Sequence, residues 1–458
     1  MKKLRWLCLA LILGLPGSAT SNALPSFARQ MDTLCIQCHT EFPILTEFGR
    51  QFKLSGYTMS AGTSSDFPPI AMMLQPSFTW TEKGQARGAA PGFGNNDNIA
   101  LSQASVFYSG RLFGPYADHL LSPDVAGFLD HFGLFDQVTY NGAAKAWGWD
   151  NADLRYASAA TLSGHAVTDG LYLNNNPTMQ DPWNTLPAWG FPFSNSQLAP
   201  TPAAGTMIDG ALAQEVAGLG AYAMIDNSIY LDFGLYRTLS AGFQKAVGVD
   251  PTGETTLSGA APYWRLAWQK AVDNGATFEA GTFGMEAGSF PGGDHTAGRD
   301  TTVDYGLDSE FQKPAGKNDF EALLTLIEEY DKGPASQALG GAANVSDHLT
   351  EYKFTLTDLY DKTYSVSAQY FITAGRADAL RYTSSANGSP LSDGAIFQLD
   401  YLPINQHGGP AFWPRSNLKV SLQYVWYNRY NGTRTNFDGA GGNARDNNTL
   451  YLETWIDF

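Results

Sequence analysis

The clearest pattern in the chain is a repeated alternation of apolar and polar residues, in stretches separated by Gly, Asn, Asp and Pro. In one stretch Ile229, Leu231 and Phe233 fall on one face, and Asp232 and Gly234 fall on the other. Successive side chains of a strand point to opposite faces, so the pattern predicts half-buried strands. The alternation is clearest at 101–112, 134–140, 147–157, 228–239, 263–272, 277–287, 302–311, 319–330, 352–360, 363–373, 418–427 and 450–458.

Tight turns join several of these stretches. Asp226-Asn227, Asp273-Asn274-Gly275 and Asp361-Lys362 predict hairpins. After about residue 70 no apolar run is long enough for a spanning helix. An apolar face toward lipid that alternates with a polar face toward a lumen is typical of outer-membrane β-barrels. The last stretch ends at Phe458 and resembles the C-terminal insertion signal of such barrels.

The length of this region indicates the size of the barrel. At ~24 residues for each strand and its turn, residues 70–458 accommodate about 16 strands. Long loops, above all the Pro- and Trp-rich stretch 174–206, are expected outside the cell. A soluble β-sandwich or propeller would also alternate. The aromatic content of 13%, the terminal Phe and the N-terminal leader favour the barrel.

The N-terminus has the pattern of an export signal. Lys2, Lys3 and Arg5 precede an apolar core at 6–15, and Ser21-Asn22-Ala23 supplies a small-residue cleavage site. A membrane anchor would need about 20 apolar residues, which this core lacks. We expect 1–23 to be a signal peptide that is cleaved after Ala23.

Charge excludes one class of function. The chain has 28 Lys and Arg against 44 Asp and Glu, a formal net charge of −16. No basic excess exists to displace counterions from phosphates, so the chain is not a nucleic-acid binder. Charge is costly on a lipid-facing surface, so the carboxylates should line the lumen and loops.

Two cysteines and a histidine form the most specific motif. Cys35 and Cys38 are separated by two residues, and His39 follows directly. This C-x-x-C-H spacing is that of covalent haem attachment, with the histidine placed to ligate iron. A redox disulfide usually lies in a thioredoxin-like context, which is missing here, and a zinc site wants a second ligand pair. The motif therefore predicts one covalently bound haem c.

The sixth iron ligand is predicted from sequence distance alone. Met59 follows His39 after enough chain to fold over the opposite haem face. Met31, Met72 and Met73 are also near in sequence. A methionine close to a motif is more often core packing than a ligand.

A family resemblance covers roughly residues 24–160. Its best-matched parts are Pro25-Ser26-Phe27-Ala28-Arg29-Gln30, the haem motif, and the run from Phe48-Gly49-Arg50-Gln51-Phe52-Lys53 to Gly56-Tyr57. Together they resemble the fused monohaem cytochrome–porins of iron-oxidising bacteria, the outer-membrane iron oxidases. Gly110-Arg111, Gln137-Val138-Thr139-Tyr140 and Asp150-Asn151-Ala152-Asp153-Leu154-Arg155-Tyr156 are similar to that family's early strands.

The resemblance implies an all-β outer-membrane protein with a small helical c-type cytochrome domain at 24–69. That domain would plug the lumen of a 16-stranded porin at 70–458. Cys35, Cys38 and His39 match the family's motif, whereas Met59 is inferred from this chain only. The implied activity is oxidation of extracellular Fe(II), with electrons passed to periplasmic cytochromes. Two alternatives stay open: a conduit for another extracellular donor or acceptor, and a plain porin with a haem-bearing plug.

Overall fold

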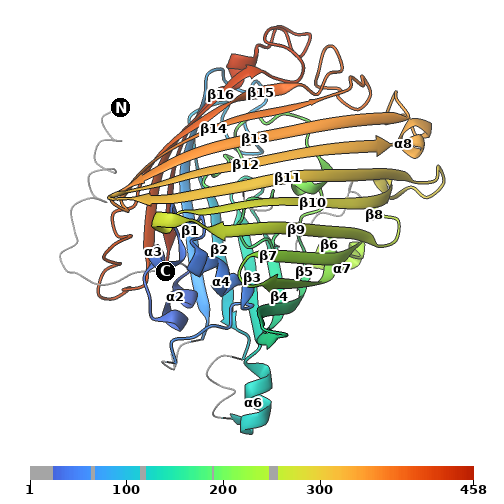
Figure 1. Cartoon of the computed structure of the whole chain (residues 1–458). Coiled ribbons are helices and arrows are strands. Elements are labelled where there is room, and N and C mark those ends of the chain that lie inside the picture. Colours follow the sequence, from blue (N-terminus) through green and yellow to red (C-terminus); the bar gives the residue numbers. More distant parts are fainter. Residues whose placement is uncertain (1–23, 63–67, 114–119, 188–189, 247–255) are drawn as a thin grey trace, which may run out of the picture.

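The chain folds into a closed antiparallel β-barrel of the porin type. The structure, a computed structural model, describes residues 24–62, 68–113, 120–187, 190–246 and 256–458, so the expected signal peptide lies outside the described part. A single 17-stranded sheet closes through pairing of β1 with β17 (Figure 1). Without the two-residue β8 (Thr256–Leu257), sixteen long strands form the wall, as predicted. They are β1 Ile70–Thr81, β2 Asn98–Arg111, β3 Phe132–Asn141, β4 Ala146–Leu162, β5 His165–Asn174, β6 Val216–Ile225, β7 Ile229–Thr238, β9 Ala261–Ala271, β10 Thr277–Phe290, β11 Asp300–Ala315, β12 Asn318–Lys332, β13 Ser346–Tyr360, β14 Tyr364–Gly375, β15 Ser392–Tyr401, β16 Asn417–Arg429 and β17 Thr449–Asp457.

The alternation in the sequence corresponds to the two faces of the wall. In β7 the side chains of Leu231 and Phe233 are exposed, whereas Tyr230 and Asp232 are buried in the lumen. The same division holds in β17, where Glu453 is buried and Leu452 is exposed. The outer surface is therefore apolar and the inner surface carries the polar groups, which is the arrangement of a barrel in a membrane.

Four strands of the wall are not among the clear stretches of alternation, namely β1, β5, β6 and β15. β6 is rich in Gly and Ala, whose small side chains give no contrast between faces. β1 contains Pro76, where the pairing with β2 shifts register. A bulge or a proline interrupts the period of two from which a strand is predicted.

The two ends of the barrel differ in their connections. Tight turns at 163–164, 226–228, 316–317 and 361–363 lie at one end, which we call the short-turn end. Longer loops at 82–97, 291–299, 333–345, 376–391 and 430–448 lie at the other. Outer-membrane barrels keep short turns on the periplasmic side and long loops outside. Within the described ranges, no helix is long and apolar enough to cross a membrane.

The tight turns have the conformation that their residues predict. Asp226 and Asn227 both have positive φ values, of 50° and 51°, and so do Asp361 and Lys362, of 49° and 53°. Two successive residues with positive φ match the twist of the flanking strands, which is why Asp and Asn are common there. These hairpins are thus confirmed.

Three short helices lie inside the barrel near the short-turn end: α2 Pro25–Met31, α3 Cys35–Cys38 and α4 Glu47–Leu54 (Figure 1). They contact inward-facing residues of several strands. For example, the hydroxyl of Tyr222 in β6 donates to the Leu54 carbonyl at 2.6 Å. Three further helices belong to the connections: α6 Pro123–Leu129, α7 Ala241–Ala246 and α8 Pro334–Ala338.

The β5–β6 connection, 175–215, also fills the lumen, and we call it the insert. Several of its large apolar residues are buried, with Trp183, Leu186 and Leu212 at 1% exposure or less. The expectation that 174–206 is an external loop is therefore wrong. Trp183 and Leu186 supply an apolar surface that must be covered, and the lumen side of β5–β12 covers it.

Candidate functional site

The C-x-x-C-H motif forms a single helical turn in the lumen. Cys35 and Cys38 are the first and last residues of α3, and both side chains are buried. Residues three apart in a helix lie on the same side of it, so the two thiols share one face. Burial raises the pKa of the Cys38 thiol to about 12. The turn thus presents two buried thiols side by side.

His39 follows the turn in an extended conformation that continues in a short bridge to Leu45. Its Nδ1 lies 2.9 Å from the Pro43 carbonyl oxygen. A carbonyl can only accept, so Nδ1 carries the hydrogen and Nε2 keeps its lone pair. Burial lowers the pKa of His39 to about 4, against the opposing effect of hydrogen bonds to Pro43 and Ile44. The ring is therefore neutral and fixed in the tautomer of a metal-ligating histidine.

Helix α4 packs directly on this turn. A Cβ at Gly49 would lie 2.2 Å from the Cys38 carbonyl oxygen, so only glycine permits the close approach. Thr46 caps α4 by accepting from Gly49 N at 3.2 Å, and its own N–H donates to the Cys38 carbonyl at 2.9 Å. The local sequence thus fixes the distance between the motif and the helix that carries Arg50 and Lys53.

A cavity of about 350 Å³ lies between the N-terminal helices, the insert and the wall formed by β17, β1, β2 and β3. Cys38 and His39 lie on its surface. Its volume falls in the range typical of small-molecule sites. Part of its surface is apolar and aromatic, made by Leu34, Phe52, Phe107, Phe135 and Trp455. Polar groups make up another part, among them Gln103, Gln137, Asp150 and Asn151.

The four candidate methionines differ in whether they lie on the cavity surface. Met31 and Met73 lie on the cavity surface, whereas Met59 does not line the cavity and packs against the adjacent aromatic cluster. Met72 points to the outer surface and is 42% exposed. Met59 as sixth ligand stays a prediction, and the cavity brings Met31 and Met73 together with His39.

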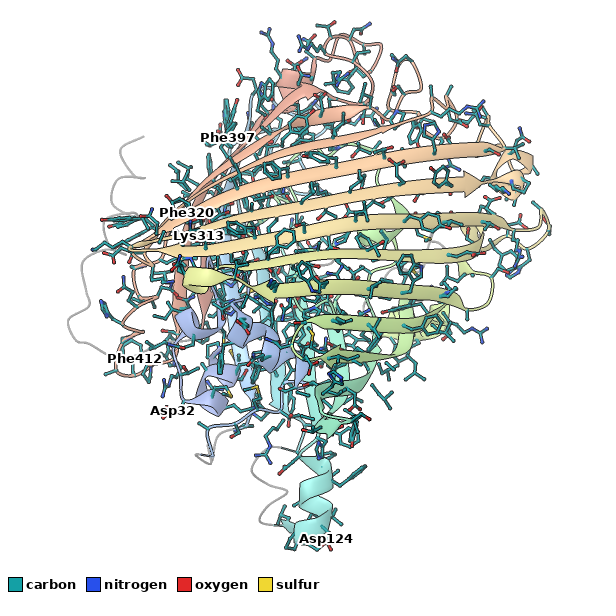
Figure 2. All side chains as sticks on the ribbon, viewed as in Figure 1. Asp32, Asp124, Lys313, Phe320, Phe397 and Phe412 are labelled. Atoms are coloured by element: carbon teal, nitrogen blue, oxygen red, sulfur yellow. The ribbon has the colours of Figure 1, made fainter. Side chains whose placement is uncertain are left out.

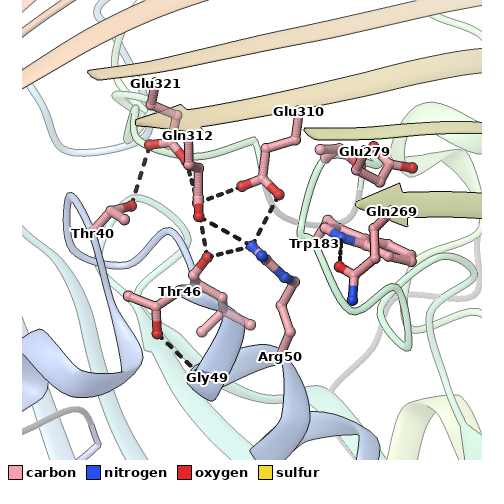
Figure 3. Close-up of polar contacts among 12 residues, drawn as sticks. Thr40, Thr46, Gly49, Arg50, Trp183, Gln269, Glu279, Glu310, Gln312 and Glu321 are labelled. Atoms are coloured by element: carbon pink, nitrogen blue, oxygen red, sulfur yellow. Dashed lines mark hydrogen bonds and ion pairs between the residues drawn. The ribbon is translucent and has the colours of Figure 1, made fainter. Parts of the chain in front are cut away.

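Buried cations join the N-terminal helices to the walls. Arg50 donates to Glu310 at 3.1 Å and to the Leu45 carbonyl at 3.0 Å, and Gln312 donates to the same carbonyl at 2.9 Å (Figure 3). An Arg–carboxylate pair that is removed from water needs such additional hydrogen bonds to offset desolvation. The backbone just before α4 is therefore held by β11.

Two further buried lysines act in the same way. Lys53 donates to the Asp181 carbonyl at 2.5 Å and to Asn184 at 2.7 Å, and so binds α4 to the insert. Lys419 of β16 donates to the carbonyls of Phe42 and Pro192 at 2.9 and 3.2 Å. Lys419 thus contacts both the loop after the haem motif and the insert. Sequence reasoning missed Lys419, because nothing near it in the chain distinguishes it from any other lysine of a strand.

Cys35, Cys38, His39 and the aromatic residues of the cavity have the chemistry that a haem site needs. In the part of the chain that the structure describes, no three His, Cys, Asp or Glu side chains form a group that could hold a metal ion. A haem site needs no such group, because the porphyrin supplies most of the iron's ligands and the protein adds axial ones. The neutral His39, the paired thiols and the aromatic cavity wall are the features that such a group requires.

Only the comparison with solved structures found proteins that are similar to this chain. No protein-family model matches it, and neither does any curated protein. Among solved structures, OprB of Pseudomonas putida is similar with a TM-score of 0.49 and 12% identity, over 85% of this chain and 94% of that one. The anion-selective porin from Comamonas acidovorans has a TM-score of 0.46 and 12% identity, over 85% and 98%. The channel DcaP of Acinetobacter baumannii has a TM-score of 0.43 and 10% identity, over 85% and 96%.

Proposed function

We propose that this chain is an outer-membrane electron-transfer protein whose barrel holds one covalent haem c at its periplasmic end. Cys35 and Cys38 would attach the haem and His39 would ligate its iron. The proposed reaction is the oxidation of extracellular Fe(II), with electrons passed to a periplasmic c-type cytochrome. The bound haem would supply a one-electron redox centre.

One observation carries the proposal: the C-x-x-C-H turn lies inside the barrel, on the wall of a ligand-sized aromatic cavity. A redox disulfide or a zinc site gives no reason for such a cavity next to a histidine with a fixed tautomer. The hydrogen bond of His39 Nδ1 to Pro43 is the support that an axial imidazole needs. The resemblance of 24–160 to the cytochrome–porins points in the same direction.

The side chains of the cavity have separate tasks in this proposal. Phe52, Phe107 and Phe135 cover part of the cavity surface with apolar rings that exclude water, which would raise the potential of a redox centre held there. Asp150 places a carboxylate on the same surface, where its charge would attract a cation that enters the lumen. Asp32 and Gln37 are exposed at the short-turn end, on the side where a periplasmic carrier would approach.

The test is the reduction of the purified protein by Fe(II). The native chain should show a c-type absorbance spectrum, and anaerobic Fe(II) should reduce it in a stopped-flow measurement. The test variant is Asp150→Asn, which keeps the cavity and removes one carboxylate from its surface. This variant should keep the spectrum and react more slowly with Fe(II). A chain that carries haem but is not reduced by Fe(II) would leave a conduit for another donor.

The plain porin is the second candidate, because the wall is a closed barrel of the porin type. In a passive channel the lumen is filled with water, whereas a packed lumen conducts poorly. Single-channel conductance in a planar bilayer separates the two functions. A large conductance that does not depend on haem loading would favour the porin.

A further inference from the structure

Two connections at the short-turn end differ from the tight turns around them. They are the β2–β3 connection, of which residues 120–131 are described and which contains α6, and the β15–β16 connection, 402–416. Both expose large apolar side chains. Leu120 is 77% exposed and Phe128 57%, and Phe412 is 70% exposed. Barrels usually have short turns at this end, so the extra length and its apolar surface need a reason.

Exposed apolar side chains form a stripe on α6 and on the residues just before it. Val125 and Phe128 lie three residues apart on one side of the helix, and both are exposed, as is Leu121 before the helix begins, whereas Ala126 is buried. The helix extends beyond the ends of β2 and β3, with Asp124 near its tip (Figures 1 and 2). A soluble protein has no use for such a stripe unless something covers it.

The base of α6 is continuous with the outer face of the barrel. The Phe128 ring contacts Phe132 at 5.3 Å and Tyr156 at 6.2 Å between ring centroids. Both partners face outward, because Phe135 of β3 and Arg155 of β4 point into the lumen. The stripe therefore extends the surface that meets the hydrocarbon of the membrane.

The β15–β16 connection makes the same junction on the other side. Trp413 stacks on Phe458 with centroids 4.8 Å apart and an interplanar angle of 20°. Phe458 faces outward, because its neighbour Asp457 is buried in the lumen. Phe412, next to Trp413 in the chain, is exposed at the same end (Figure 2). Aromatic rings at the end of the apolar band are the side chains that favour the headgroup region.

We infer that these two connections are interfacial anchors, which lie in the headgroup region of the lipid leaflet at the short-turn end. The occupant of both apolar surfaces is phospholipid, because each surface continues the outer face of the wall. A soluble partner that docks at the mouth of the lumen would need apolar rings directed over the opening. The proposal is independent of haem, because it rests on the outer face of the barrel only.

The anchors also have a position that relates them to the cavity. They flank the segment of wall formed by β16, β17, β1 and β2, and the last three of these strands line the cavity. An amphipathic helix in the interface adds buried apolar area to the membrane contact of the strand ends. The cavity side of the barrel would thus be held at a fixed depth in the leaflet.

The test is the accessibility of spin labels in the full-length protein reconstituted in phospholipid vesicles. A nitroxide is attached at Val125→Cys, and the matched control is Gly127→Cys on another side of α6, where an added Cβ meets no atom within 4 Å. Cys35 and Cys38 are buried, so the unsubstituted chain reports the background labelling. Phe412→Cys and His407→Cys form the second pair.

The label at Val125 should show a ratio of oxygen to nickel-complex accessibility several-fold higher than the label at Gly127. The same difference should separate Phe412 from His407. Equal, water-like ratios within each pair would overturn the proposal. Dipolar broadening between labels on neighbouring molecules would also overturn it, because the apolar stripe would then meet a second copy. Heat-modifiable migration on gels verifies that each variant is folded.

Discussion

The two sides of the lumen are filled in different ways. On the side of β5–β12 the insert and the wall form one continuous apolar core, with Trp183, Tyr230 and Tyr263 fully buried. On the side of β17 and β1–β3 the N-terminal helices approach the wall and leave the cavity. Both sides have the same strands and the same inward alternation. The difference teaches that the open space is local and beside the haem motif, rather than the remainder of a general channel.

The packed side also contains buried polar side chains that are connected by hydrogen bonds and ion pairs. Tyr172 donates to Asp232 at 2.9 Å, and Gln180 donates to the other oxygen of the same carboxylate at 2.9 Å. Arg265 meets three carboxylates, those of Asp181, Glu279 and Asp308. These contacts connect the insert to several strands of the wall, so they fix the insert in one arrangement. On the cavity side Gln137 donates to Ser105 and Thr139 within the wall, and the space beside it is open to a ligand.

The largest expected effect is the loss of covalent haem from the cavity side. The double variant Cys35→Ala, Cys38→Ala should carry none, because both thioether bonds need a thiol. The barrel should still form, because the packed side is unchanged. Haem staining after denaturing electrophoresis measures the first outcome and heat-modifiable migration the second. Met72→Ala, on the outer face, is the control that should keep its haem. A stained band in the double variant would contradict the haem assignment.

A second prediction compares the cost of truncation on the two sides. Trp183→Ala should lower the free energy of unfolding by about 3–5 kcal/mol, because Trp183 fills a dense core and donates to Gln269. Phe135→Ala should cost less, because Phe135 already borders open space. Urea unfolding in detergent micelles measures both. If the two variants are equally destabilised, the two sides are packed alike and the comparison fails.

The strands of the wall can be predicted from the sequence because the alternation of apolar and polar residues identifies the two faces of each strand. The inward Asp232 and outward Phe233 follow from sequence positions alone. The strand number follows from length because each strand must span the same membrane thickness. The insert is different. Its buried Trp183 is covered by strands far away in the chain, and no local period reports a surface that only tertiary contact creates.

The candidate site likewise has a part that the sequence predicts and a part that it does not. The spacing of Cys35, Cys38 and His39 lies within one short stretch of sequence, so it can be recognised without the structure. The Pro43 carbonyl that fixes the tautomer and the tight contact at Gly49 depend on how the chain turns after the motif. Lys419 reaches the site from the other end of the chain. Charged side chains that join distant parts of the chain in this way have no sequence signature, because their partners, such as the Phe42 carbonyl and the Glu41 carboxylate, lie far away in the sequence.

The third prediction sharpens the assignment of the sixth ligand on the cavity side. Replacing the ligating methionine with alanine should lower the haem potential or open the sixth position, since Met raises the potential relative to His. Met31→Ala, Met73→Ala and Met59→Ala are compared by visible spectrum and midpoint potential. The distance from His39 in the sequence predicts that Met59→Ala changes the potential. The position of Met31 and Met73 on the cavity surface predicts that one of their variants does so instead. A change at Met59 alone would mean that the segment after α4 moves when haem binds.

The last prediction is a pH dependence at the boundary between the two sides, where Lys53 joins α4 to the insert. Burial lowers the pKa of Lys53 to about 7, with a further lowering from Arg155, partly opposed by Asp181 and Asp153. Between pH 7 and the usual value of 10.5 the unfolded chain therefore binds a proton that the folded chain does not. The free energy of unfolding should rise with pH across this window, by roughly 1 kcal/mol per pH unit, and level off below pH 7. Lys53→Met should flatten the rise in urea titrations, whereas Lys245→Met, an exposed position in α7, should keep it. If Lys53→Met keeps the full slope, Lys53 stays charged in the folded state, and the contact between helix and insert is an ionic one.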